Sequence, residues 1–474
     1  MAAPAMSADL EHFDIQGIVA RGYGNLKASS FLLLAIEEPK AAKRWLAGVS
    51  GSITSAERRP DARAVNVAFT ARGLSRIGLP PAVVEGFSFE FRDGMTSAHR
   101  RRVLGDLEDN APETWAWGGP ATPGIDVLVM AYGRDESELD AALSDIVTTS
   151  SGVSTVASLQ TVALTDREHF GWHAGISQPV IEGMNHAGAA SNTVEAGEFV
   201  LGYPNEYGLY ADSPTIARSL PEANLLPEDP RGSGGVDLGR NGSYLVLRQL
   251  SQDVPGFWRF VADAAGASHN GGEAERIGLA AKMMGRWPSG APLVVSPDED
   301  DASLADENDF GYHALDPHGF RCPKGSHVRR AHPRDSLDPE PGSEKSIDIG
   351  KRHRILRRGR QYGSWVSPLA PRTHVERGAE DEDRGLYFMC LNANLARQFE
   401  FIQHTWINNP KFDGLYDDAD PVVAPRSATG RTFTVPNRTV RRRITGLPSF
   451  VTVRGGAYFF LPGIRAIRYL ASLT

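Results

Sequence analysis

Apolar runs of strand length alternate with amphipathic segments along the first third of the chain. Residues 29–36 (SSFLLLAI) predict a buried strand, and residues 37–49 place Ala, Trp and Leu at helical spacing. The same alternation predicts a strand at 64–69, a short helix at 71–77, a strand at 125–133 and a helix at 135–147. Asp135 is a suitable N-cap for the last helix, whose apolar residues fall on one face.

A comparable order of elements returns in the second half of the chain. Residues 243–250 (SYLVLRQL) predict a strand that leads into a helix near 256–265. Residues 385–393 predict another strand, which leads into a helix at 394–406. This order predicts two copies of a βαββαβ unit, whose open sheets pack face to face and bury a common core.

Two segments break the pattern. Residues 201–242 are rich in Pro, Gly, Asn and Asp and predict a long irregular connection, a kind of segment that is usually functional in compact proteins. Residues 296–309 (SPDEDDASLADEND) are acidic, but they lack the alternating ligands and central Gly of a calcium loop. We interpret them as a solvated surface loop.

The composition is that of an ordinary globular protein and excludes several classes. The formal net charge of −8 disfavours nucleic acid as a partner, because phosphate binding needs a clustered basic surface. Cys322 and Cys390 form neither a disulfide framework nor a zinc-binding pair. The N-terminus shows no signal peptide and no apolar run reaches spanning length, so we expect a cytoplasmic protein without a membrane partner.

The strongest chemical signal is the segment 321–335 (RCPKGSHVRRAHPRD), followed by the basic stretch 351–360 (KRHRILRRGR). His327 stands beside Arg329, Arg330 and Arg334. A neutral imidazole is a common axial ligand of haem iron, and arginines suit the carboxylates that haem carries. An isolated histidine is more often a core or capping residue, but this surrounding favours a ligand.

Several long motifs in the same order resemble the dye-decolorizing peroxidases, in their longer soluble form, along nearly the whole chain. They are DIQGIVARGYG, HFGWHAGISQP, GEFVLGYPNEYG, ENDFGYHALDPHGFRCPKGSHVRRAHPRD, RILRRGRQYG, GLYFMCLNANLARQFEFIQHTW and FVTVRGGAYFFLPG. The resemblance implies an α+β fold of two ferredoxin-like domains, with antiparallel sheets packed as a dimeric α+β barrel and helices on the outside. Residues 1–230 would carry the distal haem loop, and residues 231–474 the proximal histidine and distal arginine.

The resemblance also implies roles for single residues. His327, in the Cys-Pro-x-x-x-His pattern, would be the proximal ligand of the iron in haem b (iron protoporphyrin IX). Arg357 matches the distal arginine. Leu386 and Phe388 alternate on one strand and match the apolar lining of the distal pocket. Because second-shell carboxylates make a ligating histidine more basic, Asp420 is expected at Nδ1 of His327, with Asp418 as the next choice.

The stretch 171–178 matches the loop that passes over the haem on its distal side. Its residues Gly175, Ile176, Ser177 and Gln178 would contact the cofactor, and Arg329 would do so from the proximal segment. Ala174 is a departure, because the family motif Gly-x-x-Asp-Gly places the usual acid–base residue there.

The sequence leaves three explanations of Ala174 open. It is a laboratory substitution of Asp, or a natural variant that relies on Arg357 with water or on His173 for proton transfer, or the mark of a haem protein that has left peroxidase chemistry. His173 has a suitable pKa range for a base, but its neighbouring position directs its side chain elsewhere. General acid–base help is worth about 10² to 10⁴ in rate, so its loss slows the reaction without abolishing haem binding.

The expected function is a haem peroxidase that oxidises phenolic or dye-like aromatic donors with hydrogen peroxide. A non-catalytic haem carrier or sensor and a haem enzyme of another reaction class remain as alternatives. Association into an oligomer or with a larger shell is left open. Tyr362, Trp365 and Trp406 are interpreted as core or pocket walls, with electron transfer to the haem edge as the alternative.

Overall fold

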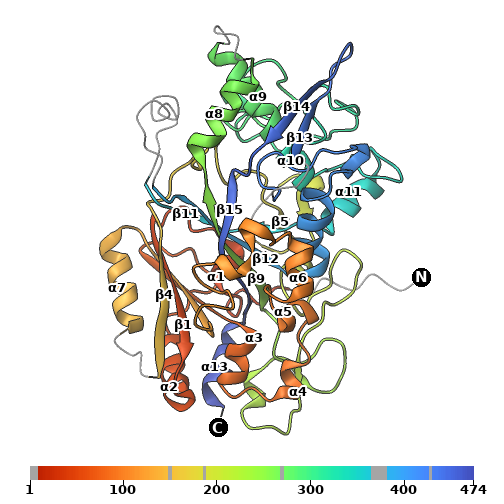
Figure 1. Cartoon of the computed structure of the whole chain (residues 1–474). Coiled ribbons are helices and arrows are strands. Elements are labelled where there is room, and N and C mark those ends of the chain that lie inside the picture. The colour runs from red at the N-terminus through yellow and green to blue at the C-terminus, as the bar shows by residue number, and fades with distance from the viewer. Residues whose placement is uncertain are drawn as a thin grey trace, which may run out of the picture.

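A nine-stranded sheet forms the centre of the molecule, and all of its strand pairs are antiparallel (Figure 1). The computed structural model describes residues 9–147, 152–184, 188–266, 272–364, 382–425 and 430–473. The sheet divides by sequence into one set of strands from each half of the chain, as the repeated pattern predicts.

The first set lies in the order β2-β3-β1-β4. Its strands are β1 (Ala28–Ile36), β2 (Arg63–Phe69), β3 (Val127–Gly133) and β4 (Val153–Gln160). Helix α2 (Pro39–Ser50) connects the first two strands, and α7 (Glu136–Val147) connects the last two. This is the predicted βαββαβ unit, in which β4 is the one strand that the apolar pattern did not reveal.

The second set repeats this arrangement in the order β10-β12-β9-β15. Its strands are β9 (Ser243–Gln252), β10 (Leu356–Arg357), β11 (Arg360–Tyr362), which also pairs with β12, β12 (Gly385–Asn392) and β15 (Val451–Leu461). If β10 and β11 are counted as one strand, each set has its second, third, first and fourth strands, numbered along the chain, side by side in that order. The α+β fold class and the internal duplication are therefore confirmed.

The two sets share one core. Phe460 of β15 pairs with Phe69 of β2, which joins the two sets side by side. At the opposite edges of the two sets, the amide of Val162, just after β4, donates to the carbonyl of Gln361 in β11 at 2.9 Å. Residues of both halves, among them Phe31, Leu245 and Phe459, pack together in one buried cluster. Whether the halves fold as the separate domains 1–230 and 231–474 stays a prediction.

Helices cover the outside of the sheet. At the start of α2 the Glu38 side chain accepts from the amides of Lys40 and Ala41, and Pro39 occupies the first turn, where no amide donor is needed. Trp45 and Leu46 on its buried face join the core. The C-terminal helix α13 (Ile464–Ser472) packs against α2.

The segment 394–406, predicted as an α-helix, has wider turns. It forms the π-helices Ala396–Glu400 and Ile402–Ile407, with hydrogen bonds from the amide of Glu400 to the carbonyl of Leu395 and from that of Asn408 to that of Gln403. The Gln398 side chain accepts from the amides of Ala393 and Asn394, just before the helix. It also donates to the carbonyls of Glu198 and Arg354, which lie in distant segments of the chain. The spacing of apolar residues does not predict these tertiary hydrogen bonds, which occur together with the wider turns.

Most connections of the second half lie above the sheet in the view of Figure 1. They contain α8 (Val254–Ala264), α9 (Glu273–Met284), α10 (His327–Ala331), α11 (Glu344–Lys351) and the hairpin of β13 (Arg431–Val435) and β14 (Arg442–Leu447). The remaining short elements are α1 (Gly17–Ala20), α3 (Ala71–Arg76), α4 (Pro81–Val84), α5 (Phe89–Asp93), α6 (Ala98–Leu104), β5 (Val180–Ile181), β6 (Thr193–Val194), β7 (Thr215–Ile216) and β8 (Val236–Asp237). The stretch 201–242 is largely irregular, as expected.

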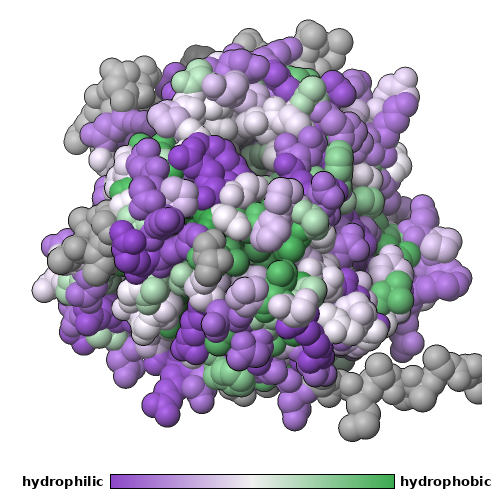
Figure 2. Space-filling view, turned by 90° about the horizontal axis from the view of Figure 1, so that it is seen from below, coloured by the Kyte–Doolittle hydropathy of each residue, from purple (hydrophilic) through white to green (hydrophobic). Residues whose placement is uncertain are grey.

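Hydrophilic side chains dominate the surface seen from below. In Figure 2, hydrophobic residues are visible mainly near the centre of that face, with hydrophilic residues around them. Among the helices that the structure describes, none combines the length and the apolar character needed to cross a bilayer.

We predict that Leu245→Ala lowers the free energy of unfolding by about 2–5 kcal/mol, because it leaves a cavity in the core that both halves share. Urea unfolding followed by circular dichroism measures this change. Val440→Ala is the matched control, because Val440 is 75% exposed and its truncation should change stability by less than about 0.5 kcal/mol. Equal effects of the two substitutions would contradict a common core at Leu245.

Candidate active site

His327 is the first residue of the short helix α10, and its ring is held from one side. Its Nδ1 lies 2.9 Å from Oδ2 of Asp420, the contact that the sequence predicted. Asp420 is itself fixed, because its Oδ1 accepts from the amides of Val422 and Val423, both at 2.9 Å. No described residue bonds to Nε2 of His327, and the side chain is 31% exposed. The geometry leaves Nε2 free to act as a ligand.

The electrostatics of this pair favour a basic imidazole. Burial acts to lower the pKa of His327, but the facing Asp420 outweighs it and the net shift is upward. Burial acts to raise the pKa of Asp420, yet His327 and the surrounding hydrogen bonds bring it below its ordinary value. Asp418, the other candidate, is engaged elsewhere, with Thr432 and the amide of Thr434.

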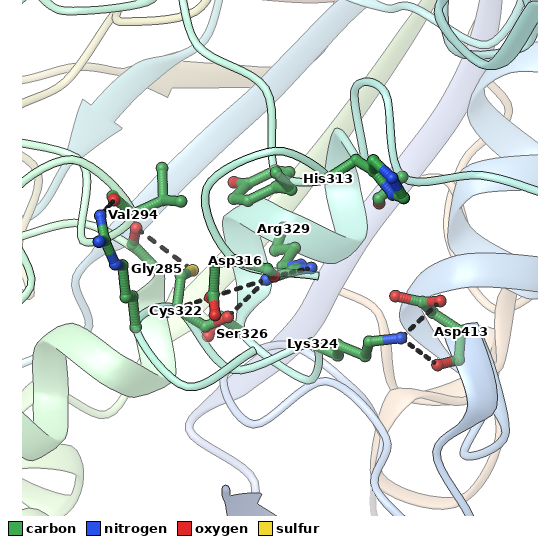
Figure 3. Close-up of polar contacts among 12 residues, drawn as sticks. Gly285, Val294, His313, Asp316, Cys322, Lys324, Ser326, Arg329 and Asp413 are labelled. Carbon is green, nitrogen blue, oxygen red and sulfur yellow. Dashed lines mark hydrogen bonds and ion pairs between the residues drawn. The ribbon is translucent and has the colours of Figure 1, made fainter. Parts of the chain in front are cut away.

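A network of buried polar groups holds the loop that precedes His327 (Figure 3). Asp316 accepts from the amide of Cys322 at 2.9 Å and from the guanidinium of Arg329 at 3.1 Å. Arg329 also donates to the carbonyl of Cys322, and Ser326 donates to the carbonyl of Lys282. The network fixes the start of α10 and therefore the direction of the His327 ring.

This network also involves Arg329 and the neighbouring thiol of Cys322. The guanidinium of Arg329 is buried, donates to Asp316 and to the carbonyl of Cys322, and lies over the ring of Tyr312. Its role in cofactor binding stays a prediction. The thiol of Cys322 is fully buried and burial raises its pKa, which disfavours the thiolate that a metal ligand requires.

Arg357 lies at the other side of the site, in β10. Its guanidinium donates to the carbonyl of Ile176 at 2.6 Å, and its amide donates to Oε1 of Gln178 at 3.0 Å. Its side chain remains exposed, although burial in the surrounding protein lowers its pKa. The charge of Arg357 acts on His327, so the structure brings these two predicted residues together.

The predicted distal loop follows a strained path beside Arg357. Gly175 has φ +83°, and a Cβ built on it meets no atom within 4 Å, so the loop borders open space there. Ser177 also has positive φ, at 64°. Its carbonyl accepts from Arg354 at 3.0 Å, and its hydroxyl lies 3.4 Å from Arg334. Backbone and side-chain atoms of 176–178 thus serve as acceptors for several arginines.

The first part of this loop is held by Glu168. Its carboxylate accepts from the amides of Phe170 at 2.9 Å and Trp172 at 3.0 Å, and from Nε2 of Gln252 at 3.1 Å. Burial raises its pKa even though these donors favour the carboxylate. The Trp172 indole stacks on that of Trp258, with ring centroids 5.6 Å apart. Glu168 and Trp172 together anchor the segment that ends at Ala174.

The structure places Ala174 in the loop and turns His173 away from it. The Ala174 amide donates to the carbonyl of Asp166 at 2.8 Å, and its methyl group is partly exposed. Nε2 of His173 faces the exposed Asp306 at 3.7 Å. The hydrogen bonds of Arg357 go to the carbonyl of Ile176 and the side chain of Gln178, and no described carboxylate pairs with it. The distal side therefore shows no described acid at Arg357.

The predicted apolar residues of β12 share one side of the strand. Leu386 and Phe388 are half-buried, whereas their neighbours Tyr387 and Met389 are buried in the shared core. The alternation agrees with the prediction that Leu386 and Phe388 line a space outside that core.

Four arginines, which we call the arginine cluster, converge near the distal loop: Arg286, Arg334, Arg354 and Arg357. Their hydrogen-bond acceptors are carbonyl, amide, hydroxyl and imidazole groups, with no described carboxylate among them. Burial lowers the pKa of Arg354 to about 9 and that of Arg286 to about 10. Burial and this cluster hold the pKa of His332 well below its usual range. Such a concentration of buried positive charge is suited to an anion.

Sequence reasoning did not single out Glu168, Arg286, Arg354 or His332. A partial signal was present for Arg354, because the stretch 351–360 concentrates basic residues without acidic neighbours. Glu168 gave no such signal, since its function is to hold backbone amides. Trp365 lies outside the described residues, while Tyr362 and Trp406 are buried core residues.

Comparisons with known proteins cover almost the whole chain. No protein-family model matches it. It is 28% identical over 477 residues to a dye-decolorizing peroxidase from Exidia glandulosa, and the alignment covers 96% of this chain and 86% of that protein. The multifunctional dye peroxidase DyP2 from Amycolatopsis sp. is 27% identical, with 93% and 91% covered.

The fold comparison agrees. The crystal structure of a fungal DyP-type peroxidase from Auricularia auricula-judae superposes with a TM-score of 0.79 at 27% identity, covering 98% of this chain and 100% of that chain. The homologues and structural neighbours are dye-decolorizing peroxidases. Similarity along nearly the full chain, together with the same fold, supports a peroxidase enzyme.

Dye-decolorizing peroxidases are haem enzymes, and the residues present here fit such a group. His327 offers a free Nε2 with a carboxylate behind it. Gly175 borders open space, and the arginine cluster offers positive charge that makes no hydrogen bond to a described carboxylate. A flat cofactor with an iron centre and two carboxylates matches all three features.

We predict that Glu168→Ala increases hydrogen exchange of the Phe170 and Trp172 amides at least about tenfold, because each loses a bond to a charged acceptor worth about 1.5–3 kcal/mol. Exchange of peptides that cover 168–175, read by mass spectrometry, measures the change. Glu136→Ala, at an exposed position of α7, is the control. Indistinguishable exchange in the two variants would show that Glu168 does not hold the loop.

Proposed function

We propose that this protein is a haem b peroxidase of the dye-decolorizing type, which oxidises phenolic or dye-like aromatic donors with hydrogen peroxide. The proposal is supported by His327, backed by Asp420, together with Arg357, which is held by the loop 176–178 and whose charge acts on His327. Full-length similarity to named peroxidases supports the same reaction class. A cytoplasmic location and association with other chains remain predictions.

Each side chain has a defined task in this proposal. His327 would bind the iron through Nε2, while Asp420 accepts the Nδ1 proton and keeps the ring oriented and basic. Arg334 and Arg354, rather than Arg329, would face the haem carboxylates beside Ser177. Haem iron, when bound, supplies the redox chemistry with peroxide.

Arg357 supplies positive charge on the distal side. Its guanidinium is preorganised by the carbonyl of Ile176, so it stabilises negative charge that develops on a peroxide oxygen without reorganising. Leu386 and Phe388 would restrict water on the same side. A guanidinium that keeps its proton is a poor base, so proton transfer between peroxide oxygens needs another group.

Ala174 is the position where that group is missing. Its methyl cannot accept a proton, and the His173 side chain is directed to Asp306 instead. We infer that the peroxide reaction is slow in this chain and depends on water for proton transfer. The same observation favours a second candidate, a haem protein without peroxidase turnover, which the experiments below distinguish.

We predict that His327→Ala abolishes the Soret absorbance of the haem-loaded protein, because it removes the one ligand of the site. Asp420→Asn should retain haem but bind it about 10- to 100-fold more weakly, since the ring loses its charged acceptor. Haem titration followed by absorbance measures both. His313→Ala, an exposed histidine in the loop before α10, is the control. Unchanged haem binding by His327→Ala would overturn the ligand assignment.

We predict that Ala174→Asp speeds the reaction of the haem-loaded protein with peroxide by about tenfold or more, because acid–base help is worth about 10² to 10⁴. Stopped-flow absorbance measures the rate constant. Ala302→Asp, an exposed Ala on a surface loop, controls for added negative charge.

The outcome also separates the candidate functions. A faster Ala174→Asp variant that consumes a dye identifies a peroxidase lacking its acid–base residue. Equal rates in both proteins would contradict the inference that proton transfer is limiting. Absence of any peroxide reaction in both proteins would support haem carriage instead of turnover.

A further inference from the structure

A cavity lies behind the distal loop, at the N-terminal motif that the proposed site does not use. Its volume is about 420 Å³, within the range of small-molecule sites. The segment 19–25 forms one wall, and 178–181 with Met184 forms another. Arg59, Leu356 and Arg358 complete the lining.

The cavity shares two residues with the support of Arg357. Gln178, which accepts from the Arg357 amide at 3.0 Å, and Leu356, which precedes Arg357 in β10, both line it. The cavity therefore adjoins the candidate active site at Gln178 and Leu356. It lies outside the set formed by His327, Asp420 and the arginine cluster.

The lining carries positive charge without a carboxylate among its described residues. Arg21 donates to the carbonyl of Ala56 at 2.7 Å, and Arg59 donates to Oδ1 of Asn25 at 3.2 Å. Arg358 donates to the carbonyls of Ile18 and Val19. Three arginines thus line one space, and the hydrogen-bond acceptors of their guanidinium groups among the described residues are neutral oxygens.

The walls between these charges are apolar and rigid. Val19, Ile181 and Met184 are buried residues of the shared core that also line the cavity. Tyr23 has φ 52° and is fixed by the bond of its hydroxyl to Asn66 at 3.0 Å. Apolar walls with a few convergent charged groups are the features of a preformed ligand site.

We propose that this cavity binds a small aromatic anion, with its carboxylate or sulfonate against Arg21 and Arg59 and its ring against the apolar wall. Arg suits such anions because its fork matches two oxygen acceptors. On the proposed function, on which this step rests, an anion of this class that also carries a phenolic hydroxyl is an electron donor, and the hydroxyl supplies the proton. Two donors then each lose one electron and one proton, and hydrogen peroxide is reduced to two waters.

The test uses naphthalene-2-sulfonate and the haem-loaded full chain, without peroxide, in calorimetric titrations. Arg21→Gln with Arg59→Gln should weaken binding at least about tenfold, a loss of about 1.4 kcal/mol. The control is Arg134→Gln with Arg218→Gln, because both arginines are more than half exposed and pair with carboxylates elsewhere. This control should bind like the unsubstituted protein. Neutral naphthalene-2-sulfonamide should bind at least about tenfold more weakly than the sulfonate.

A second variant tests the location independently of the arginines. Gly24 lines the cavity, and a Cβ built on it meets nothing within 4 Å, so Gly24→Phe should obstruct binding without a clash at its Cβ. Absence of saturable binding would overturn the proposal. So would equal affinity for sulfonate and sulfonamide, or equal loss in the two double variants.

Failure of this proposal is distinguishable from failure of the proposed function. Haem absorbance and the peroxide reaction report the function without the sulfonate, and the titration reports the cavity without turnover. A chain that reacts with peroxide but binds no sulfonate refutes the cavity site alone. A haem-loaded chain that binds the sulfonate through Arg21 and Arg59 but does not react with peroxide retains the cavity site and refutes the peroxidase.

Discussion

Buried positive charge beside the distal loop is the constraint on which the candidate site depends. Removing a charged group from water costs several kcal/mol unless other groups compensate. The buried Arg334 and Arg354 meet that cost with oxygens of Ser177 and of neighbouring segments, and the exposed Arg357 donates to the carbonyl of Ile176. The loop therefore has little freedom to move, because any shift leaves guanidinium donors without acceptors.

The opposite side of the site has the reverse polarity. Asp420 stands behind the His327 ring, so negative charge lies on the far side of the imidazole and positive charge on the side of Arg357. This arrangement makes the imidazole a better electron-pair donor and favours anions in front of it. The methyl group of Ala174 offers no proton acceptor, so these charges stand without an acid–base group at that position.

The sequence predicted those features that follow from residue type and local spacing alone. The apolar strands 29–36 and 243–250 are present, and His327 meets Asp420 as expected. It did not foresee the pairing of Arg329 with Asp316, and the role of Arg329 in cofactor binding stays a prediction. It also missed the π-helical turns after β12, because the bonds of Gln398 to distant backbone groups leave no trace in hydrophobic spacing.

The amino-acid sequence by itself determined the duplicated strand and helix order, the candidate ligand and the absence of an acid at position 174. These properties depend on local spacing and residue identity, which a chain carries before it folds. Only the tertiary structure decided which arginines pair with a carboxylate and which do not. It also placed His173 beside Asp306 and a cavity lined by arginines beside Gln178. The reason is that hydrogen-bond partners and open space are set by segments far apart in sequence, brought together when both halves close on one core.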